Sequence, residues 1–144
     1  MAEDAGTPEG NKAIIERFWE DLGRRDFEAV AGYFVEGSHY TDVPAPEDGA
    51  RGPKAIVARL RLGIEPLERY EPLPGKMVAE GDTVILEHSE AWYWTSGEHV
   101  VLPFVSVFEL RDGSIVRWWD YWDLGTLMNA APASWVEHIM VGYK

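Results

Sequence analysis

The stretch RWWDYWDL at residues 117–124 places one carboxylate among four aromatic side chains near the end of the chain. Successive side chains of a β-strand point to opposite faces, so we expect Trp118, Asp120 and Trp122 to share one face of a strand. If that face borders a closed cavity, burial raises the pKa of Asp120 and suits its carboxyl group to proton transfer near neutral pH. The alternative is a strand with core aromatics on both faces and with Asp120 at a wet edge.

The composition of the chain excludes several classes of protein. With 144 residues and no cysteine, we expect one domain with a substantial core, without disulfides or cysteine-based metal sites. The net charge of −12 repels phosphate backbones and anionic membranes, so we expect neither a nucleic-acid nor a membrane partner. The first residues lack the basic start and apolar run of a signal peptide, and no apolar run approaches the ~18 residues of a membrane span. These features predict a cytoplasmic protein.

The N-terminal part of the chain has the periodicity of helices. Residues 1–9 are acidic and contain Gly and Pro, which predicts a flexible arm ahead of a single domain at residues 10–144. Apolar residues then recur at helical spacing and stop at Gly23, which predicts an amphipathic first helix.

Two further helices and one strand are expected next. Asp26 can cap a short second helix whose apolar face extends to Phe34. Residues 38–43 alternate as a strand would, and a third helix is expected from Pro53.

From Tyr70 onward the hydrophobic period changes to two, which indicates strands. Turn signals divide the segment into expected strands at residues 72–80, 83–94, 98–110 and 114–123, followed by a helical turn at 126–130 and a helix from Ser134. Helices followed by an antiparallel meander predict an α+β fold, with a curved antiparallel sheet wrapped around the N-terminal helices. Such a cone has one interior pocket.

Several chemically active side chains are expected on the inner face of this sheet. Alternation on the second long strand selects Leu86, His88, Glu90, Trp92 and Trp94. If this set faces the same interior as Asp120, His88 and Glu90 meet it there, and Tyr40 and Asp42 join from the early strand. Three buried carboxyl groups cannot all be charged, so their environments would separate acid from base roles. A one-residue bulge would instead turn Glu90 or Asp42 to water.

The histidines do not form a metal-binding pattern. His39, His88, His99 and His138 contain no pair spaced by four residues and no His-Glu-x-x-His motif, although His88 and Glu90 could supply two ligands. No Gly-x-Ser-x-Gly nucleophile elbow is present. We therefore expect neither a metal nor another cofactor.

Four segments resemble the limonene-1,2-epoxide hydrolases: YTDVP at 40–44, RGPKAI at 51–56, VILEHSE at 84–90 and DGSIVRWWDYWDL at 112–124. These enzymes belong to the nuclear transport factor 2-like superfamily of cone-shaped folds, with the ketosteroid isomerases, scytalone dehydratase and the SnoaL-like polyketide cyclases. The resemblance covers about residues 11–125 and implies the same cone.

The resemblance also implies roles for five residues. In the epoxide hydrolases a Tyr and an Asn hold a water, an Arg-x-Asp pair supplies a bridging cation and the general acid, and a later Asp is the base. Tyr40 and Asp120 match the Tyr and the base, whereas Asp42 replaces the Asn, His88 the Arg and Glu90 the acidic Asp. A histidine titrates where an arginine stays charged, so these departures move the site toward the proton shuttles of dehydratases and isomerases.

The leading hypothesis is an epoxide hydrolase-like enzyme that opens a small apolar epoxide in one step. Glu90 would protonate the oxygen, Asp120 would deprotonate a water held by Tyr40 and Asp42, and His88 would lie between the carboxylates. The alternative enzyme is a SnoaL-like or ketosteroid isomerase-like lyase or isomerase acting next to a carbonyl. There His88 with Asp42 or Asp120 would be the base, and Tyr40 the oxyanion donor.

A third hypothesis is a non-catalytic module for binding a small ligand or for dimerisation. In that case Arg59, Arg61 or Arg117 would hold the carboxylates. In such a module the pocket would be filled by Trp92, Trp94, Trp118 and Trp122. In an enzyme we expect the pocket to be lined by Trp92, Trp94, Trp118, Trp122 and Leu86. A second sheet face that carries Ile85, Tyr93, Trp119 and Tyr121 predicts a homodimer.

Overall fold

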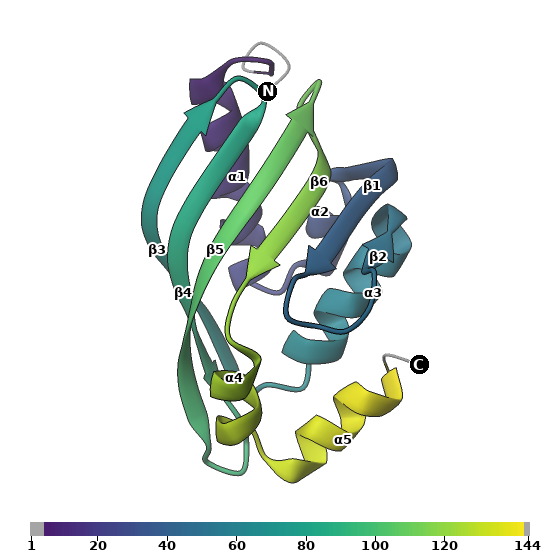
Figure 1. Ribbon diagram of the computed structural model, residues 1–144, viewed down its shortest axis with the longest axis vertical. Coiled ribbons are helices and arrows are strands. Elements are labelled where there is room, and N and C mark those ends of the chain that lie inside the picture. Colours follow the sequence, from purple (N-terminus) through teal and green to yellow (C-terminus); the bar gives the residue numbers. More distant parts are fainter. Residues whose placement is uncertain (1–4, 143–144) are drawn as a thin grey trace.

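The computed structural model describes residues 5–142 as helices packed on one curved sheet (Figure 1). The elements are α1 (Pro8–Gly23), α2 (Phe27–Ala31), β1 (Phe34–Asp42), β2 (Ala50–Arg51), α3 (Gly52–Ile64), β3 (Arg69–Glu80), β4 (Thr83–Tyr93), β5 (His99–Arg111), β6 (Ser114–Tyr121), α4 (Leu124–Ala130) and α5 (Ala133–Gly142). The α+β class is therefore confirmed.

Helix α1 begins inside the segment that was expected to be a flexible arm. The Thr7 side chain accepts a hydrogen bond from the backbone N–H of Gly10 at 3.0 Å, and Pro8 occupies the first helical position. These two signals start the helix at Pro8, so the expectation for residues 8 and 9 is wrong. The expectation for residues 1–4 lies outside the described residues.

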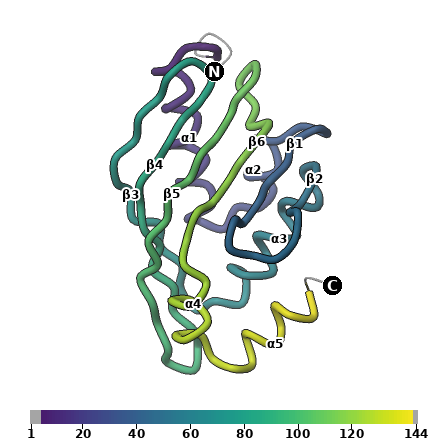
Figure 2. The backbone as a smooth tube through the Cα atoms, in the orientation of Figure 1, coloured from purple at the N-terminus to yellow at the C-terminus, as the bar shows by residue number. Residues whose placement is uncertain are grey.

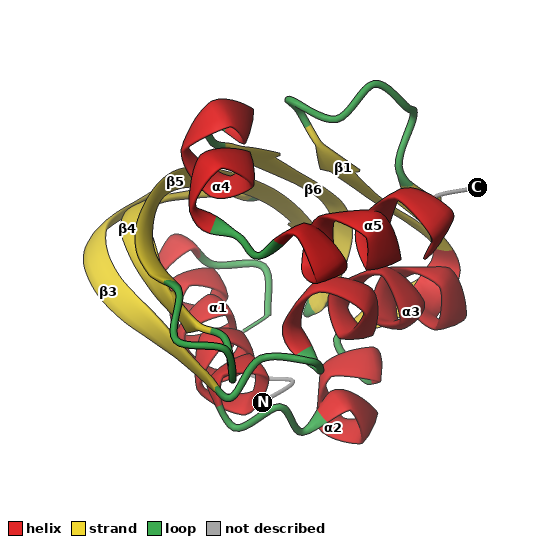
Figure 3. Cartoon of the chain, turned by 90° about the horizontal axis from the view of Figure 1, so that it is seen from below, coloured by secondary structure: helices red, strands yellow, loops and turns green. Residues whose placement is uncertain are grey.

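The sheet has the strand order β2-β1-β6-β5-β4-β3. Strands β3 to β6 form the predicted antiparallel meander. Strand β1, however, pairs with β6 in parallel, so the sheet is mixed rather than purely antiparallel. Seen from below, the strands curve around α1 without closing, and α3 and α5 lie at the open side, whereas α4 lies against β5 (Figure 3).

Strand β1 begins earlier than its alternation indicated. Asp26 caps α2 as predicted, because its carboxylate accepts from the backbone N–H of Ala29 at 3.1 Å, but the helix ends at Ala31. Phe34 is the first residue of β1 and not part of the helix face, and its ring packs 5.8 Å from Phe18 and 6.2 Å from Trp118. Phe34 lies seven positions after Phe27, which fits a helical face, and six positions before Tyr40, which fits one face of a strand. Its packing in the core is compatible with the strand alone.

An irregularity interrupts β3 opposite His88. The pairing with β4 skips from Leu73 to Lys76, so Pro74 and Gly75 lie across from His88. A Cβ atom on Gly75 would lie 1.9 Å from the carbonyl oxygen of Glu87, so only glycine fits this approach. The regular pairing of β3 with β4 is therefore interrupted beside His88.

The inner face of the sheet and α1 form the core, while the outer face carries exposed apolar side chains. Phe18, Phe108 and Trp118 are fully buried, and Phe18 and Phe108 meet Trp118 at ring distances of 5.2 and 5.4 Å. On the outer face Ile85 and Tyr121 are exposed as expected. Within the described residues, no helix has the length and apolar character that crossing a membrane requires.

Candidate functional site

A cavity of about 410 Å³ lies between the inner face of the sheet and the helices. Its walls include Trp19 of α1, Leu60 of α3, Leu127 of α4 and Trp135 of α5. The sheet contributes aromatic rings and three carboxyl groups: Tyr40, Asp42, Tyr70, Glu90, Trp92, Phe104, Trp118 and Asp120. The wall is thus apolar except at three carboxyl groups, two phenol hydroxyls and the guanidinium of Arg59, and a mostly apolar wall with a few polar groups is typical of a small-molecule site.

Asp120 is 3% exposed and is held by three donors. Its Oδ1 accepts from the Nε1–H of Trp118 at 2.7 Å and from the hydroxyl of Ser106 at 2.6 Å. Its Oδ2 lies 3.2 Å from the hydroxyl of Tyr40. Burial, and then the charge of Asp42, raise the pKa of Asp120 well above its usual range. Asp120 is therefore a buried carboxyl group, not a residue at a wet edge.

The parallel pairing of β1 with β6 brings Tyr40 and Asp42 to Asp120. Tyr40 is opposite Trp118 with the two rings stacked at 3.8 Å, and Asp42 is opposite Asp120. The hydroxyl of Tyr40 also lies 2.7 Å from Asp42 Oδ1, which the Nε1–H of Trp122 reaches at 3.0 Å. Burial raises the pKa of Asp42, although Tyr40, Trp122 and Arg59 oppose the shift. Two such close carboxylates resist being charged together.

Glu90 borders the same cavity from β4. Its Oε2 accepts from the hydroxyl of Tyr70 at 2.6 Å, and its Oε1 accepts from the Nε1–H of Trp92 at 3.0 Å. Burial raises the pKa of Glu90 to about 7, and Asp42 adds to the shift. At neutral pH a large fraction of Glu90 therefore carries its proton.

His88 does not lie between the carboxylates, and that expectation is wrong. Its Nε2 lies 2.7 Å from the hydroxyl oxygen of Ser106, and its ring packs against Phe104 and Trp19 at 5.4 and 4.7 Å. It is not among the residues that line the cavity. Burial lowers the pKa of His88 to about 4, so the imidazole is neutral at pH 7. It reaches Asp120 only through Ser106.

Three of the five expected lining residues face the cavity: Trp92, Trp118 and Trp122. Trp94 does not, because it packs against Trp135 at 5.6 Å beyond the end of the cavity. Leu86 does not either, since it borders a separate hollow between α1 and β3. Alternation predicts which face of β4 points inward. It does not predict how far along that face the cavity extends.

Two residues that hold the site were missed from the sequence, Tyr70 and Ser106. Ser106 is a single hydroxyl on the otherwise apolar inner face of β5, and it is fully buried. A lone polar residue at an inward position of an apolar strand is a signal that it has a buried polar partner. Tyr70, at the start of β3, gave no such signal beyond its alternation.

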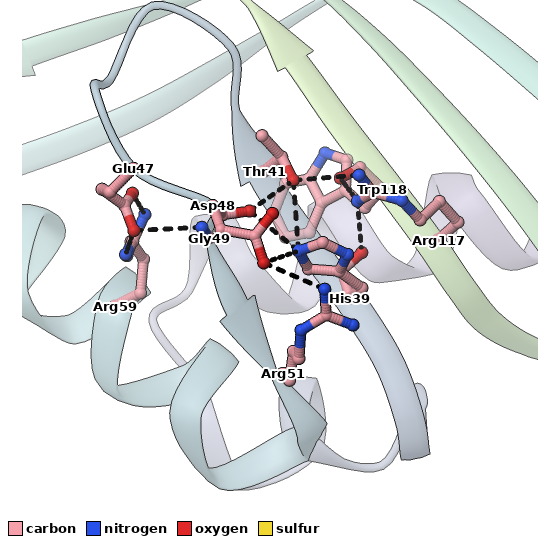
Figure 4. Close-up of polar contacts among 9 residues, drawn as sticks. All are labelled: His39, Thr41, Glu47, Asp48, Gly49, Arg51, Arg59, Arg117 and Trp118. Atoms are coloured by element: carbon pink, nitrogen blue, oxygen red, sulfur yellow. Dashed lines mark hydrogen bonds and ion pairs between the residues drawn. The ribbon is translucent and has the colours of Figure 1, made fainter.

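The segment after β1 doubles back to β2 (Figure 2) and contributes to the cavity wall. We call residues 43–49 the rim loop, of which Ala45 and Pro46 line the cavity. Arg59 of α3 donates to both carboxylate oxygens of Glu47 at 2.5 and 2.8 Å, as Figure 4 shows. The same guanidinium lies 3.7 Å from Asp42 Oδ2. The rim loop is therefore tied to the helix that faces the acidic pair.

The outer side of the rim loop is tied to β1 (Figure 4). The carbonyl oxygen of Asp48 lies 3.0 Å from the hydroxyl of Thr41 and 2.8 Å from Nε2 of His39. Arg117 donates to the carbonyl of His39 and to the hydroxyl of Thr41, each at 3.0 Å. The adjacent Gly49 has a φ of +111° and lies against Tyr40. These contacts hold the rim loop close to the two catalytic candidates of β1.

Of the three arginines that could have neutralised the carboxylates, Arg59 reaches one, because its guanidinium lies 3.7 Å from Asp42 Oδ2 while it also pairs with Glu47. Arg61 pairs with Glu65 and Arg117 bonds to β1, so neither of these two reaches the acidic groups of the cavity. In the part of the chain that the structure describes, no group of three or more His, Cys, Asp or Glu side chains is arranged to hold a metal ion.

Comparison with known proteins places these features in context. A family model described as the SnoaL-like domain matches residues 15–118, whereas no curated protein matches the chain. An LEH-like epoxide hydrolase of M. tuberculosis is 22% identical, with coverage of 94% of this chain and 93% of that chain and a TM-score of 0.72. A putative SnoaL-like polyketide cyclase from Shewanella putrefaciens CN-32 is 15% identical, with coverage of 86% and 96% and a TM-score of 0.75. At such identities the likeness to solved structures shows the fold alone.

Proposed function

We propose that this chain, which belongs to the SnoaL-like domain family, is a cofactor-independent enzyme that opens a small apolar epoxide by direct attack of water. The observation that carries the proposal is the pair of buried carboxyl groups, Glu90 and Asp120, that border one apolar cavity from different strands. An acid and a base at the same cavity are what a one-step opening needs. The epoxide hydrolase among the structural neighbours supports this choice of reaction.

Glu90 acts as the general acid. Its pKa of about 7 leaves it largely protonated at and below neutral pH. The Nε1–H of Trp92 and the hydroxyl of Tyr70 orient its two oxygens. Glu90 donates its proton to the epoxide oxygen as the carbon–oxygen bond breaks, and it ends the step as a carboxylate.

Asp120 acts as the general base. In the proposed step, a water bound beside Asp120 Oδ2 attacks the epoxide carbon and gives one proton to Asp120. The new carbon–oxygen bond forms as the ring bond breaks, so the product is a diol and no covalent enzyme intermediate arises. One proton leaves Glu90 and one arrives at Asp120, and exchange with solvent restores both groups.

A second candidate, a lyase or isomerase that acts next to a carbonyl, uses the same groups. It is favoured by the absence of an arginine bridge between Glu90 and Asp120, because His88 is neutral and outside the cavity. In that reaction Asp120 takes a proton next to the carbonyl, and protonated Glu90 donates to the enolate oxygen. His88 cannot be the base there, since it does not line the cavity.

The proposal is tested with a panel of small apolar epoxides and of β-hydroxy and β,γ-unsaturated carbonyl compounds. We expect diol formation from at least one epoxide, with ¹⁸O from labelled water in the product after a single turnover. Asp120→Asn and Glu90→Gln should each abolish it, whereas Glu87→Gln on the exposed face of the same strand should not. Turnover of carbonyl compounds alone would select the second candidate.

Inactivity toward both substrate classes would contradict both enzymatic functions. If the wild-type protein and Asp120→Asn then bind apolar ligands with equal affinity, the chain is a small-ligand-binding module. This outcome is separable from misfolding, because both proteins should show the same far-ultraviolet circular dichroism and the same cooperative unfolding.

A further inference from the structure

We propose that His88, acting through Ser106, is the positioning residue that keeps the carboxylate of Asp120 in its proton-accepting form. The inference rests on the proposed function, in which Asp120 is the base. Its geometric basis is a buried chain of three side chains across β4, β5 and β6. His88 Nε2 lies 2.7 Å from Ser106 Oγ, which lies 2.6 Å from Asp120 Oδ1.

The direction of each hydrogen bond in this chain follows from the carboxylate. An ionised carboxylate only accepts, so the hydroxyl of Ser106 must donate to Asp120. The oxygen of Ser106 is then left to accept from His88, and Nε2 must carry a hydrogen. Burial holds His88 neutral, with a pKa of about 4, which is consistent with this single tautomer. His88 thus prevents the hydroxyl from turning away from the base.

The chain also distinguishes the two oxygens of Asp120. Oδ1 receives the short bonds from Ser106 and Trp118, at 2.6 and 2.7 Å. Oδ2 faces only the longer 3.2 Å contact with Tyr40, whose hydroxyl lies closer to Asp42, at 2.7 Å. A hydroxyl has one hydrogen to donate, and the shorter contact with Asp42 competes for it. The geometry therefore assigns proton uptake from water to Oδ2.

His88 can act on Asp120 without contacting the substrate. It borders two hollows beside Pro74 and Gly75 at the β3 bulge, and it does not line the main cavity. The titratable groups that border these hollows are Glu16 and Glu20 of α1, Glu87 of β4 and Tyr121 of β6. Those around Asp120 are Tyr40 and Asp42 of β1, Arg59 of α3, Tyr70 of β3 and Glu90 of β4. Only the path through Ser106 connects His88 to Asp120 by hydrogen bonds that the structure records.

The first test measures the pKa of Asp120 directly, in protein without substrate. The carboxyl infrared band of Asp120 is assigned by difference from Asp120→Asn and followed across the pH range. Ser106→Ala should raise the pKa by about one unit, and His88→Leu should raise it by a smaller amount. His88→Gln should leave it near the wild-type value, because the amide of glutamine can donate to Ser106. Ser89→Ala, which removes a hydroxyl beside the same hollow, is the matched control.

The second test uses the pH profile of the reaction. The acid limb of kcat should move with the measured pKa of Asp120 in each variant, while the KM and the maximal rate above that limb stay within about twofold. A role of His88 in packing alone would lower stability equally in His88→Leu and His88→Gln and would leave the limb in place.

Two results would overturn the inference. One is an unchanged Asp120 pKa in a folded His88→Leu protein, and the other is an equal shift in His88→Leu and His88→Gln. Neither result depends on turnover, so the inference and the proposed function fail separately. Full activity in Asp120→Asn would remove the base role but would leave the infrared result interpretable.

Discussion

At the scale of single residues, the site consists of ordinary acids placed in an unusual environment. Glu90 is the clearest case, because burial against an apolar wall makes its charged form costly, although Tyr70 and Trp92 donate hydrogen bonds to it. Its folded pKa of about 7 lies above the 4.5 of an exposed glutamate, so between these values the folded protein binds more protons than the unfolded chain. The free energy of unfolding contributed by Glu90 must therefore fall as pH rises through this window.

Glu90→Gln should remove the loss of unfolding free energy that Glu90 causes as pH rises. Relative to wild type, the variant should gain about 3 kcal/mol in unfolding free energy between pH 4 and pH 8, because 2.5 units of pKa correspond to about that amount. Urea unfolding of both proteins at several pH values measures the difference. Glu87→Gln, exposed on the same strand, serves as the control and should show no such gain. A pH-independent difference between Glu90→Gln and wild type would show that Glu90 is charged when folded.

The same pKa predicts the alkaline limb of activity. Epoxide opening should decline above about pH 7, as Glu90 loses the proton that it donates. An exposed histidine would titrate near this range, but the buried imidazole of His88 has a pKa of about 4 and stays neutral over it. His88→Gln should therefore keep the alkaline limb. Loss of the limb in that variant would return the role to His88.

The identity of the site residues could be read from alternation, but their hydrogen-bond partners could not. Tyr40, Asp42, Glu90 and Asp120 all border the cavity, because each strand has one buried face and the period of two fixes which residues share it. The contact of His88 with Ser106 depends on the register of β5 against β4, which places Phe104 opposite His88 and Ser106 one step along the same face. Such contacts depend on the packed positions of several strands, which no single stretch encodes.

At the scale of elements, the site depends on the parallel pairing of β1 with β6, which the sequence did not predict. The pairing places Asp42 opposite Asp120, although the two are far apart in the chain. Antiparallel neighbours can be recognised in the sequence from the short turns that join them. A parallel pair has no such local signal, because the connection between its strands is long. The meander of β3 to β6 was predictable for the opposite reason.

The rim loop should depend on Gly49. A Cβ atom there would lie 2.1 Å from the carbonyl oxygen of Tyr40, and its φ of +111° is strained for any other residue. Gly49→Ala should therefore lower the unfolding free energy by about 2 kcal/mol or more and reduce kcat/KM at least about tenfold. Denaturant unfolding and steady-state kinetics measure the two effects.

Gly37→Ala is the matched control for this change. Gly37 lies in the same strand as Tyr40, and a Cβ atom there would meet nothing within 4 Å. We expect its stability to stay within about 1 kcal/mol of wild type, with unchanged kinetics. Equal effects of the two substitutions would mean that β1 tolerates no change, and that the rim loop has no special dependence on Gly49.

At the scale of the whole molecule, the outer face of the sheet carries exposed apolar side chains. Val78, Ile85, Val101, Val105 and Tyr121 are exposed on strands β3 to β6, opposite the cavity. Val78 pairs with Ile85, and Val105 pairs with Tyr121, so the apolar side chains adjoin across neighbouring strands. The same face also carries the charged residues Glu87, which pairs with Val105, and Glu109, which pairs with Arg117. An exposed apolar patch within such a face is typical of a surface that a second protein molecule covers.

We propose that the second molecule is another copy of this chain, since the same face on two copies pairs around a twofold axis without leaving an open surface. Sedimentation velocity should show a dimer at micromolar concentration, and Ile85→Glu should shift it to a monomer by burying two charges at the centre of the face. Val141→Glu adds the same charge at an exposed apolar position of α5, and we expect it to leave the dimer intact. A wild-type protein that sediments as a monomer at every concentration would contradict the proposal.

The cavity lies on the other side of the sheet from this face. A monomeric Ile85→Glu protein should therefore keep its activity, and an assay of that protein would separate dimerisation from catalysis.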